Sequence, residues 1–172
     1  KKSLIFVAPN GKTAIMDYTG KYSGLAIADY LIEKAQQENK KITNLGVLKM
    51  IFFAQGFGFP ELQMALIRDD FYAWALGPVE PKTYEVFKQY GSSNILAPSG
   101  KTISELEDIK SRPERVQFLD KISELTDVNP FVLMAKTHEA GSPWEITGLY
   151  NKINPELICQ YYTYNYGHYK RS

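Results

Sequence analysis

The chain has few of the side chains from which catalytic and metal centres are built. Its 172 residues include one cysteine, Cys159, and two histidines, His138 and His168. A single cysteine forms no internal disulfide and cannot supply the paired thiolates of a structural zinc site. Neither histidine has another candidate ligand at metal-binding spacing, so we expect no metal site and no cofactor.

The sequence also lacks a charge excess of either sign and a long apolar run. Lys and Arg total 20 and Asp and Glu total 19, which gives a formal net charge of +1. This balance argues against a dedicated nucleic-acid coat or a polybasic membrane binder. No apolar run approaches the ~20 residues of a membrane span, and the run at residues 4–8 is too short for a signal peptide. We therefore expect a cytoplasmic protein without membrane contact.

Apolar content, by contrast, is ample for one folded domain. Hydrophobic residues make up 44% of the chain and aromatic residues 13%, which excludes a disordered polar chain. A chain of this length is expected to form one domain, because domains commonly have roughly 100–200 residues.

The first residues predict a β-hairpin. Two runs with strand character, residues 4–8 and 13–18, flank Asn10-Gly11, a strong signal for a tight hairpin turn. We expect residues 1–22 to form this hairpin as an extension of a helical domain over residues 23–172. A two-stranded hairpin is marginally stable alone, so a homo-oligomer that covers it with a second chain is one expected arrangement.

Two helices are predicted next. Ser23 is a suitable N-cap for an amphipathic helix that reaches to about Asn39. Thr43 is a suitable N-cap for residues 45–57, which have almost no polar side and therefore predict a buried central helix. Gly56, Gly58 and Pro60 are unfavourable in a helix, so we expect this helix to stop early.

The second half of the chain is divided by prolines. A short extended segment is predicted near residues 64–75, and rigid irregular backbone is predicted at 77–81. Proline suits the first position of a helix, and five helices are expected to begin at one: Pro81, Pro113, Pro130, Pro143 and Pro155. The predicted fold is mainly α, a compact multi-helix domain with a buried central helix, a minor β component and a Tyr-rich C-terminal tail.

The candidates for chemistry are weak one by one. Cys159 follows Leu157-Ile158, where a buried small apolar side chain is the more favoured interpretation. The adjacent acids Asp69 and Asp70 have no evident partner for acid–base catalysis. His138 either donates to a carbonyl at the end of the preceding helix or contacts a partner beside Trp144. We expect that the protein is not an enzyme.

Several short motifs occur in a recognisable order. They are ADYLIEKA at 28–35, ITNL at 42–45, LKMIFFAQG at 48–56, DFYAW at 70–74, GPV at 77–79 and THEAGSPW at 137–144. In this order and spacing they resemble the Panacea domain family, which includes SocA-like antitoxins and GepA-like prophage-associated proteins. The resemblance covers about residues 25–162, whereas the hairpin precedes the usual start of the pattern.

The resemblance implies an antitoxin that neutralises a cognate toxin by direct protein–protein binding. The candidate partner-binding residues lie in its last motifs: Asp70, Phe71, Trp74, Gly77, Pro78, His138, Ser142, Pro143 and Trp144. Alternatives are a proteolytic adaptor that also contacts a cellular protease, or a prophage accessory binding protein. A DNA-binding autoregulator is less favoured, because the Tyr-rich tail adds little positive charge beyond Lys170 and Arg171.

Overall fold

A computed structural model describes residues 3–7 and 11–169 and is mainly helical, as the sequence predicts. Its α-helices are α1 (Gly24–Gln37), α2 (Asn44–Leu62), α3 (Pro81–Phe87), α4 (Ile103–Lys110), α5 (Pro113–Ser123), α6 (Pro130–Thr137), α7 (Pro143–Thr147) and α8 (Pro155–Tyr169). Two 3-10 turns are η1 (Lys88–Tyr90) and η2 (Glu124–Asp127). Strand β1 (Ser3–Val7) pairs antiparallel with β2 (Thr13–Asp17), and β3 (Tyr72–Trp74) pairs antiparallel with β4 (Gly77–Val79).

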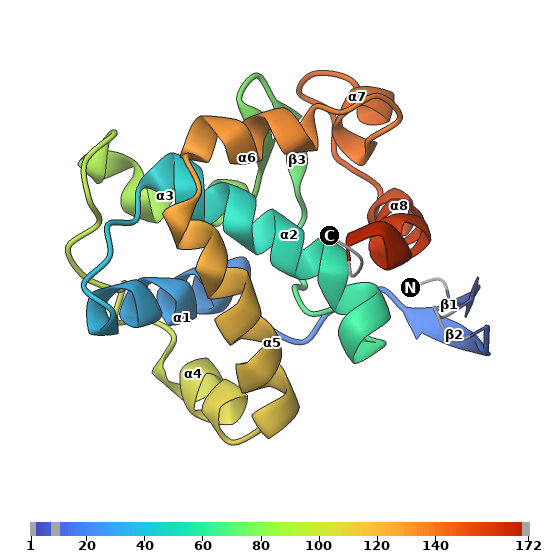
Figure 1. Cartoon of the computed structure of the whole chain (residues 1–172), viewed down its shortest axis with the longest axis horizontal. Helices are drawn as coiled ribbons and strands as arrows, with labels where there is room; N and C mark the ends of the chain where they lie inside the picture. The colour runs from blue at the N-terminus through green and yellow to red at the C-terminus, as the bar shows by residue number, and fades with distance from the viewer. Residues whose placement is uncertain (1–2, 8–10, 170–172) are drawn as a thin grey trace.

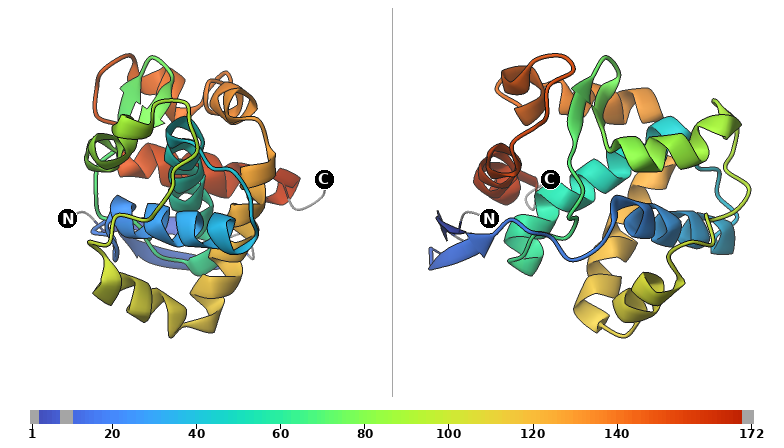
Figure 2. Two further views of the ribbon diagram at one scale, coloured as in Figure 1. Left: turned by 90° about the vertical axis from the view of Figure 1, so that its left-hand side faces the viewer. Right: turned by 180° about the vertical axis from the view of Figure 1, so that it is seen from behind.

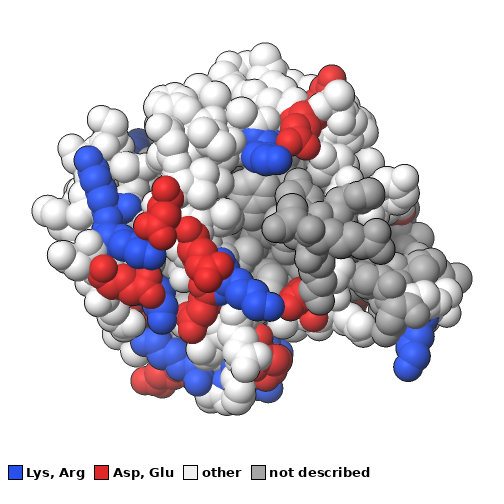
Figure 3. Space-filling view, in the orientation of Figure 1, with Lys and Arg blue, Asp and Glu red and all other residues white. Residues whose placement is uncertain are grey.

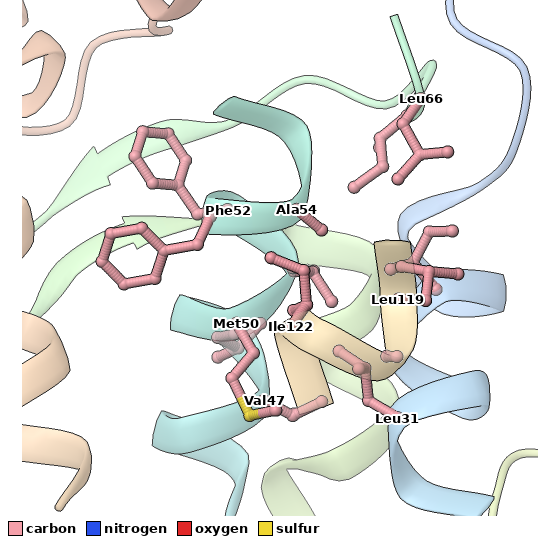
Figure 4. Close-up of a cluster of buried hydrophobic side chains, with 14 of the residues drawn as sticks. Leu31, Val47, Met50, Phe52, Ala54, Leu66, Leu119 and Ile122 are labelled. Atoms are coloured by element: carbon pink, nitrogen blue, oxygen red, sulfur yellow. The ribbon is translucent and has the colours of Figure 1, made fainter. Parts of the chain in front are cut away.

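Helix α2 runs through the middle of the molecule, with α1, α5, α6 and α8 around it (Figure 1). Its apolar side chains are buried on every side of the helix, which confirms the predicted central helix. In Figure 4 the α2 side chains of Val47, Met50 and Phe52 lie in one cluster with Leu31 of α1 and Leu119 of α5. The core therefore has α2 as its axis.

The expectation that this helix stops early was wrong. It continues to Leu62, and Pro60 lies in its last turn, where it removes one N–H donor from the helix. Gly56 is packed against the Tyr162 ring of α8, and a Cβ on it would lie 2.5 Å from the ring. Close tertiary packing of this kind outweighs the unfavourable helix propensity of the glycines.

Most of the predicted helix starts are confirmed by their caps. The Ser23 hydroxyl accepts from Ala26 N–H at 3.0 Å, and the Thr43 hydroxyl accepts from Gly46 N–H at 3.2 Å. All five predicted proline starts are the first residues of helices, namely α3, α5, α6, α7 and α8. Helix α4 was not predicted, and α1 ends two residues before Asn39.

The second hairpin differs from its prediction. The extended segment expected near residues 64–75 contains a strand only at its end, β3, and the irregular backbone expected at 77–81 is strand β4 over its first three residues. Trp74 pairs with Gly77 across the turn formed by Ala75 and Leu76. Pro78 is accommodated because β4 is an edge strand, where a missing N–H donor is tolerated. The rear view in Figure 2 shows this hairpin over α2, between α3 and α8.

The N-terminal hairpin is confirmed, with a register from Ser3 opposite Asp17 to Val7 opposite Thr13. Its turn at residues 8–10 lies outside the described residues. Directly after β2, Tyr18 packs edge-on against Phe59 of α2, with ring centroids 5.7 Å apart. Much of the predicted Tyr-rich tail belongs to α8, and residues 170–172 are outside the described part. Over residues 3–7 and 11–169, none of the helices combines the length and apolar character of a membrane span.

Candidate partner-binding site

The motifs at 70–74 and 137–144 meet where the β3–β4 hairpin packs against α7. The His138 ring stacks on the Trp144 indole, with centroids 3.7 Å apart and an interplanar angle of 12°. The indole Nε1 of Trp144 donates to the Trp74 carbonyl at 2.7 Å. The Trp74 ring in turn lies edge-on to Tyr84 of α3 at 5.1 Å. Two aromatic pairs from segments far apart in the sequence are thus joined by a hydrogen bond, and we call these four residues the aromatic cluster.

The ring of His138 stacks and makes no hydrogen bond to a carbonyl among the described residues. Its Nε2 is buried and has no partner there. Burial lowers the pKa of His138, and the positive charge of Lys49 lowers this pKa further. The neutral imidazole is therefore the favoured form at neutral pH, which suits a ring held flat against an indole.

Lys49 is a functional candidate that the sequence analysis missed, because it lies in an otherwise apolar helix. Its side chain is fully buried, and burial lowers its pKa to about 7. Its Nζ donates to the Pro78 carbonyl at 2.7 Å, which ties α2 to β4. A Cβ on Gly77 would be 2.8 Å from Cε of Lys49, and the φ of Gly77 is +104°, so both space and backbone require glycine.

The nine predicted partner-binding residues differ in how far they are buried. Asp70 is exposed and pairs with Lys152 at 3.4 Å. Trp74, His138 and Trp144 are half-buried. The other five are buried: Phe71, Gly77, Pro78, Ser142 and Pro143. The buried residues position the hairpin and α7, and the four remaining side chains are the ones accessible to a partner.

A pocket of about 440 Å³ opens beside the aromatic cluster, between α2, the β3–β4 hairpin and α3. Trp74 and Tyr84 are among its apolar walls, and Asn44 and Lys49 are among its polar groups. Asn44 is the first residue of α2 and is buried, and its Oδ1 has no hydrogen-bond partner among the described residues. The pocket therefore combines apolar walls with two buried polar residues in its lining.

Large exposed apolar side chains gather at this end of the molecule. The described residues include ten of them, and six lie on the β3–β4 turn, on α6, or on α7 and the turn after it. These six define the apolar surface: Leu76, Phe131, Val132, Ile146, Leu149 and Tyr150. Figure 3 shows that the surface over α6 and α7 has few charged side chains, whereas charges crowd the lower left of the same view. Exposed apolar side chains on a surface with few charges typically mark a site of protein contact.

Groups for other chemistry are sparse in the described part of the chain. No cluster of three or more His, Cys, Asp or Glu side chains is placed there to hold a metal ion. Cys159 is buried, as predicted, and burial raises the pKa of its thiol. This end of the helical fold therefore presents an apolar surface with a pocket beside it.

Comparison with known proteins identifies the family. The family model described as "Antitoxin SocA-like, Panacea domain" matches residues 47–145, which is more than half of the chain, and the protein belongs to this family. The chain is also similar to Antitoxin SocA of Caulobacter vibrioides (strain NA1000 / CB15N). The two are 29% identical over 127 residues, which cover 70% of this chain and 68% of that relative. No solved structure matches the chain significantly.

Proposed function

We propose that this protein is an antitoxin that neutralises a cognate toxin by direct binding, and that the toxin contacts the apolar surface. Membership of the SocA-like family supports the antitoxin role. The observation that carries the location is the gathering of exposed apolar side chains on α6, α7 and the β3–β4 turn. Such patches on a folded domain are commonly covered by a partner.

The aromatic cluster holds in place the elements that carry the apolar surface. The hydrogen bond from Trp144 to Trp74 and the stack on His138 fix the start of α7 against the β3–β4 hairpin. Ile146 and Leu149 follow in the same stretch of chain and are exposed. A toxin would then contact side chains that α7 presents, while the buried motif residues hold α7 in place.

A charge placed in this surface tests the proposal. Ile146→Asp should abolish neutralisation of the toxin encoded by the neighbouring gene, because a carboxylate at an apolar interface must be desolvated without a partner. Ile103→Asp on α4 is the matched control, because Ile103 is 63% exposed, Ile146 is 60% exposed, and α4 lies at the opposite end of the molecule (Figure 1).

The assay is growth on co-expression of toxin and antitoxin, with circular dichroism melts of each purified variant. We expect Ile103→Asp to rescue growth and Ile146→Asp to fail, both with melts like that of the wild type. Rescue by both variants, or failure of both, contradicts the placement of the toxin on the apolar surface.

A further inference from the structure

We propose that Tyr150 and the pocket beside it are the anchor point of the toxin, with an apolar side chain of the toxin seated in the pocket against the Tyr150 ring. The proposal rests on the proposed function, because it names the part of the apolar surface that contributes most to binding. Leu76 and Tyr150 belong to the apolar surface and also line the pocket, so the two features are continuous.

The backbone of Tyr150 has an unfavourable conformation. Its φ is +67°, in the left-handed region that a bulky residue rarely adopts. The other positions with positive φ in the described part of the chain are seven glycines, Asn39 and Gln63. Asn39 and Gln63 directly follow the ends of α1 and α2, where a left-handed residue commonly terminates a helix. Helix α7 ends at Thr147, so helix termination does not account for the conformation of Tyr150.

Hydrogen bonds to β3 hold Tyr150 in this conformation. Its N–H donates to the Ala73 carbonyl at 2.6 Å, and the Ala73 N–H donates to the Asn151 carbonyl at 3.0 Å. Both bonds involve backbone atoms, so they do not require a tyrosine side chain. Glycine or asparagine would adopt the same backbone with less strain, as Gly148 does with a φ of +80° two residues earlier.

The fold makes little use of the Tyr150 side chain. The residue is 69% exposed, and it is not among the described apolar side chains that form the core or pack against it. Residues that are held in strained backbone conformations cluster at ligand clamps and other functional sites. Tyrosine is also one of the residue types that most often dominate the energy of an interface. A strained backbone that presents an exposed ring therefore points to a contact with a partner.

The pocket favours an apolar occupant over a charged one. Its described lining contains no Asp or Glu, so a cationic side chain would have no anion to pair with there. Its two lysines are already engaged, because Lys49 is buried and donates to the Pro78 carbonyl, and Lys88 pairs with Glu85 at 2.7 Å. The volume of about 440 Å³ is in the usual range of ligand pockets, roughly 300–1,000 Å³. The walls are mostly apolar side chains, namely Leu45, Leu48, Trp74, Leu76, Val79 and Tyr84.

Two substitutions to asparagine separate the strain from the contact. Tyr150→Asn removes the ring and relieves the backbone, and Gln63→Asn is the matched control at an exposed position with a φ of +54°. We expect both variants to melt at or above the wild-type temperature, because asparagine tolerates the left-handed region. Only Tyr150→Asn should weaken binding of the toxin encoded by the neighbouring gene, by about thirtyfold or more, as expected for the loss of an interface anchor.

The readouts are circular dichroism melts, growth on co-expression with the toxin, and the dissociation constant of the purified pair. Tyr150→Phe retains the ring and should recover most of the affinity that Tyr150→Asn loses. A wild-type dissociation constant for Tyr150→Asn overturns the proposal. A clearly lowered melt of Tyr150→Asn also overturns it, because the ring would then belong to the fold. Equal losses in Tyr150→Phe and Tyr150→Asn would assign the contact to the hydroxyl and contradict an apolar anchor.

A second pair of variants tests the chemistry of the occupant. Leu76 lines the pocket and is 52% exposed, and Asp and Asn have nearly the same shape. Leu76→Asp and Leu76→Asn should both lose neutralisation, because an apolar side chain gains nothing from either polar group. Rescue by Leu76→Asp alone would indicate a cationic occupant, and rescue by Leu76→Asn alone a polar or anionic one. Either result, or rescue by both variants, contradicts the proposal.

The outcomes distinguish this proposal from the proposed function on which it rests. Loss of rescue by Ile146→Asp together with normal toxin binding by Tyr150→Asn would retain the apolar surface as the toxin site and reject the anchor. Full rescue by Ile146→Asp with loss of binding by Tyr150→Asn and by both Leu76 variants would do the reverse. The toxin would then contact the pocket and Tyr150 without covering α7.

Discussion

Tyr162 of α8 lies against Gly56 of α2 with no room for a side chain between them. A Cβ on the glycine would be 2.5 Å from Cδ2 of the tyrosine. The same ring is edge-on to Phe52 at 5.8 Å and to Phe57 at 5.0 Å. This contact closes the core on the side of α8, and it makes the glycine a requirement of packing.

Gly56→Ala is therefore expected to lower the free energy of unfolding, although alanine is the better helix former. Displacing a buried ring commonly costs about 1–3 kcal/mol, which exceeds the gain in helix propensity of about 1 kcal/mol. Gly58→Ala is the matched control in the same helix, because its nearest neighbour, Leu66, would be 3.5 Å away. Urea unfolding should show Gly58→Ala unchanged or stabilised, and a stabilised Gly56→Ala would mean that α8 can shift.

Lys49 predicts a dependence of stability on pH. Its pKa is lowered to about 7 in the folded state, so between pH 7 and 10 the unfolded chain binds one more proton there and stability rises with pH. The slope is up to about 1.4 kcal/mol per pH unit, and Lys49→Met should lack it. The pKa of His138, which is close enough to feel the charge of Lys49, is lowered, so His138 titrates below this pH range. The pKa of Lys88 is raised by Glu85, so Lys88 does not titrate within the range.

The measurement is urea unfolding of the wild type and of Lys49→Met at pH 7 and pH 9, compared as a difference so that shared titrations cancel. The range stops at pH 9 because buried tyrosines such as Tyr30, with raised pKa values, add a dependence of the opposite sign at higher pH. Parallel curves for the two proteins would mean that Lys49 stays charged in the folded state.

Phe52→Ala tests the central helix itself. The Phe52 side chain is fully buried in the core, so its removal should cost about 3–5 kcal/mol. Phe131→Ala on α6 removes an equal side chain from an exposed position and should change stability by about 0.5 kcal/mol or less. A loss under about 1 kcal/mol for Phe52→Ala in urea unfolding would contradict a packed core around α2.

The half-buried aromatic stack gives a prediction for the partner site. His138→Ala should leave the fold within about 1–2 kcal/mol of the wild type but weaken toxin neutralisation, since it removes the ring on which Trp144 rests. His138→Phe restores a stacking ring without the imidazole nitrogens. Rescue of growth by His138→Phe would assign the role to stacking, whereas failure of both variants would assign it to the polar atoms. Full rescue by His138→Ala would make the residue a part of the scaffold.

Local signals in the sequence predicted the starts of helices well. Ser23 and Thr43 act as caps, and the proline starts hold, because a cap or a first-turn proline depends on residues within one helical turn. Local signals gave wrong predictions where contacts between residues distant in the sequence determine the backbone conformation. Pro60 did not end α2, since α8 packs along that helix, and Gly77 begins a strand because its backbone lies against Lys49.

The site was predictable only in outline. The motifs indicated two segments, which the structure brings together where the Trp144 indole donates to the Trp74 carbonyl. Burial within those segments, such as that of Ser142, follows from tertiary packing, which no spacing reveals. The burial of Lys49 could not be predicted, because one lysine in an apolar helix gives the same sequence pattern whether its side chain reaches solvent or is buried.

The contact between α2 and α8 also sets an order of events during synthesis. The apolar side of α2 that Tyr162 covers leaves the ribosome about a hundred residues before Tyr162 itself. At roughly 5–20 residues per second, Phe52 and its neighbours wait on the order of 5–20 s for the helix that completes their enclosure. During that interval the nascent chain carries an uncovered aromatic strip. Chaperones that bind such strips are therefore expected to act on this protein before α8 is made and to leave it afterwards.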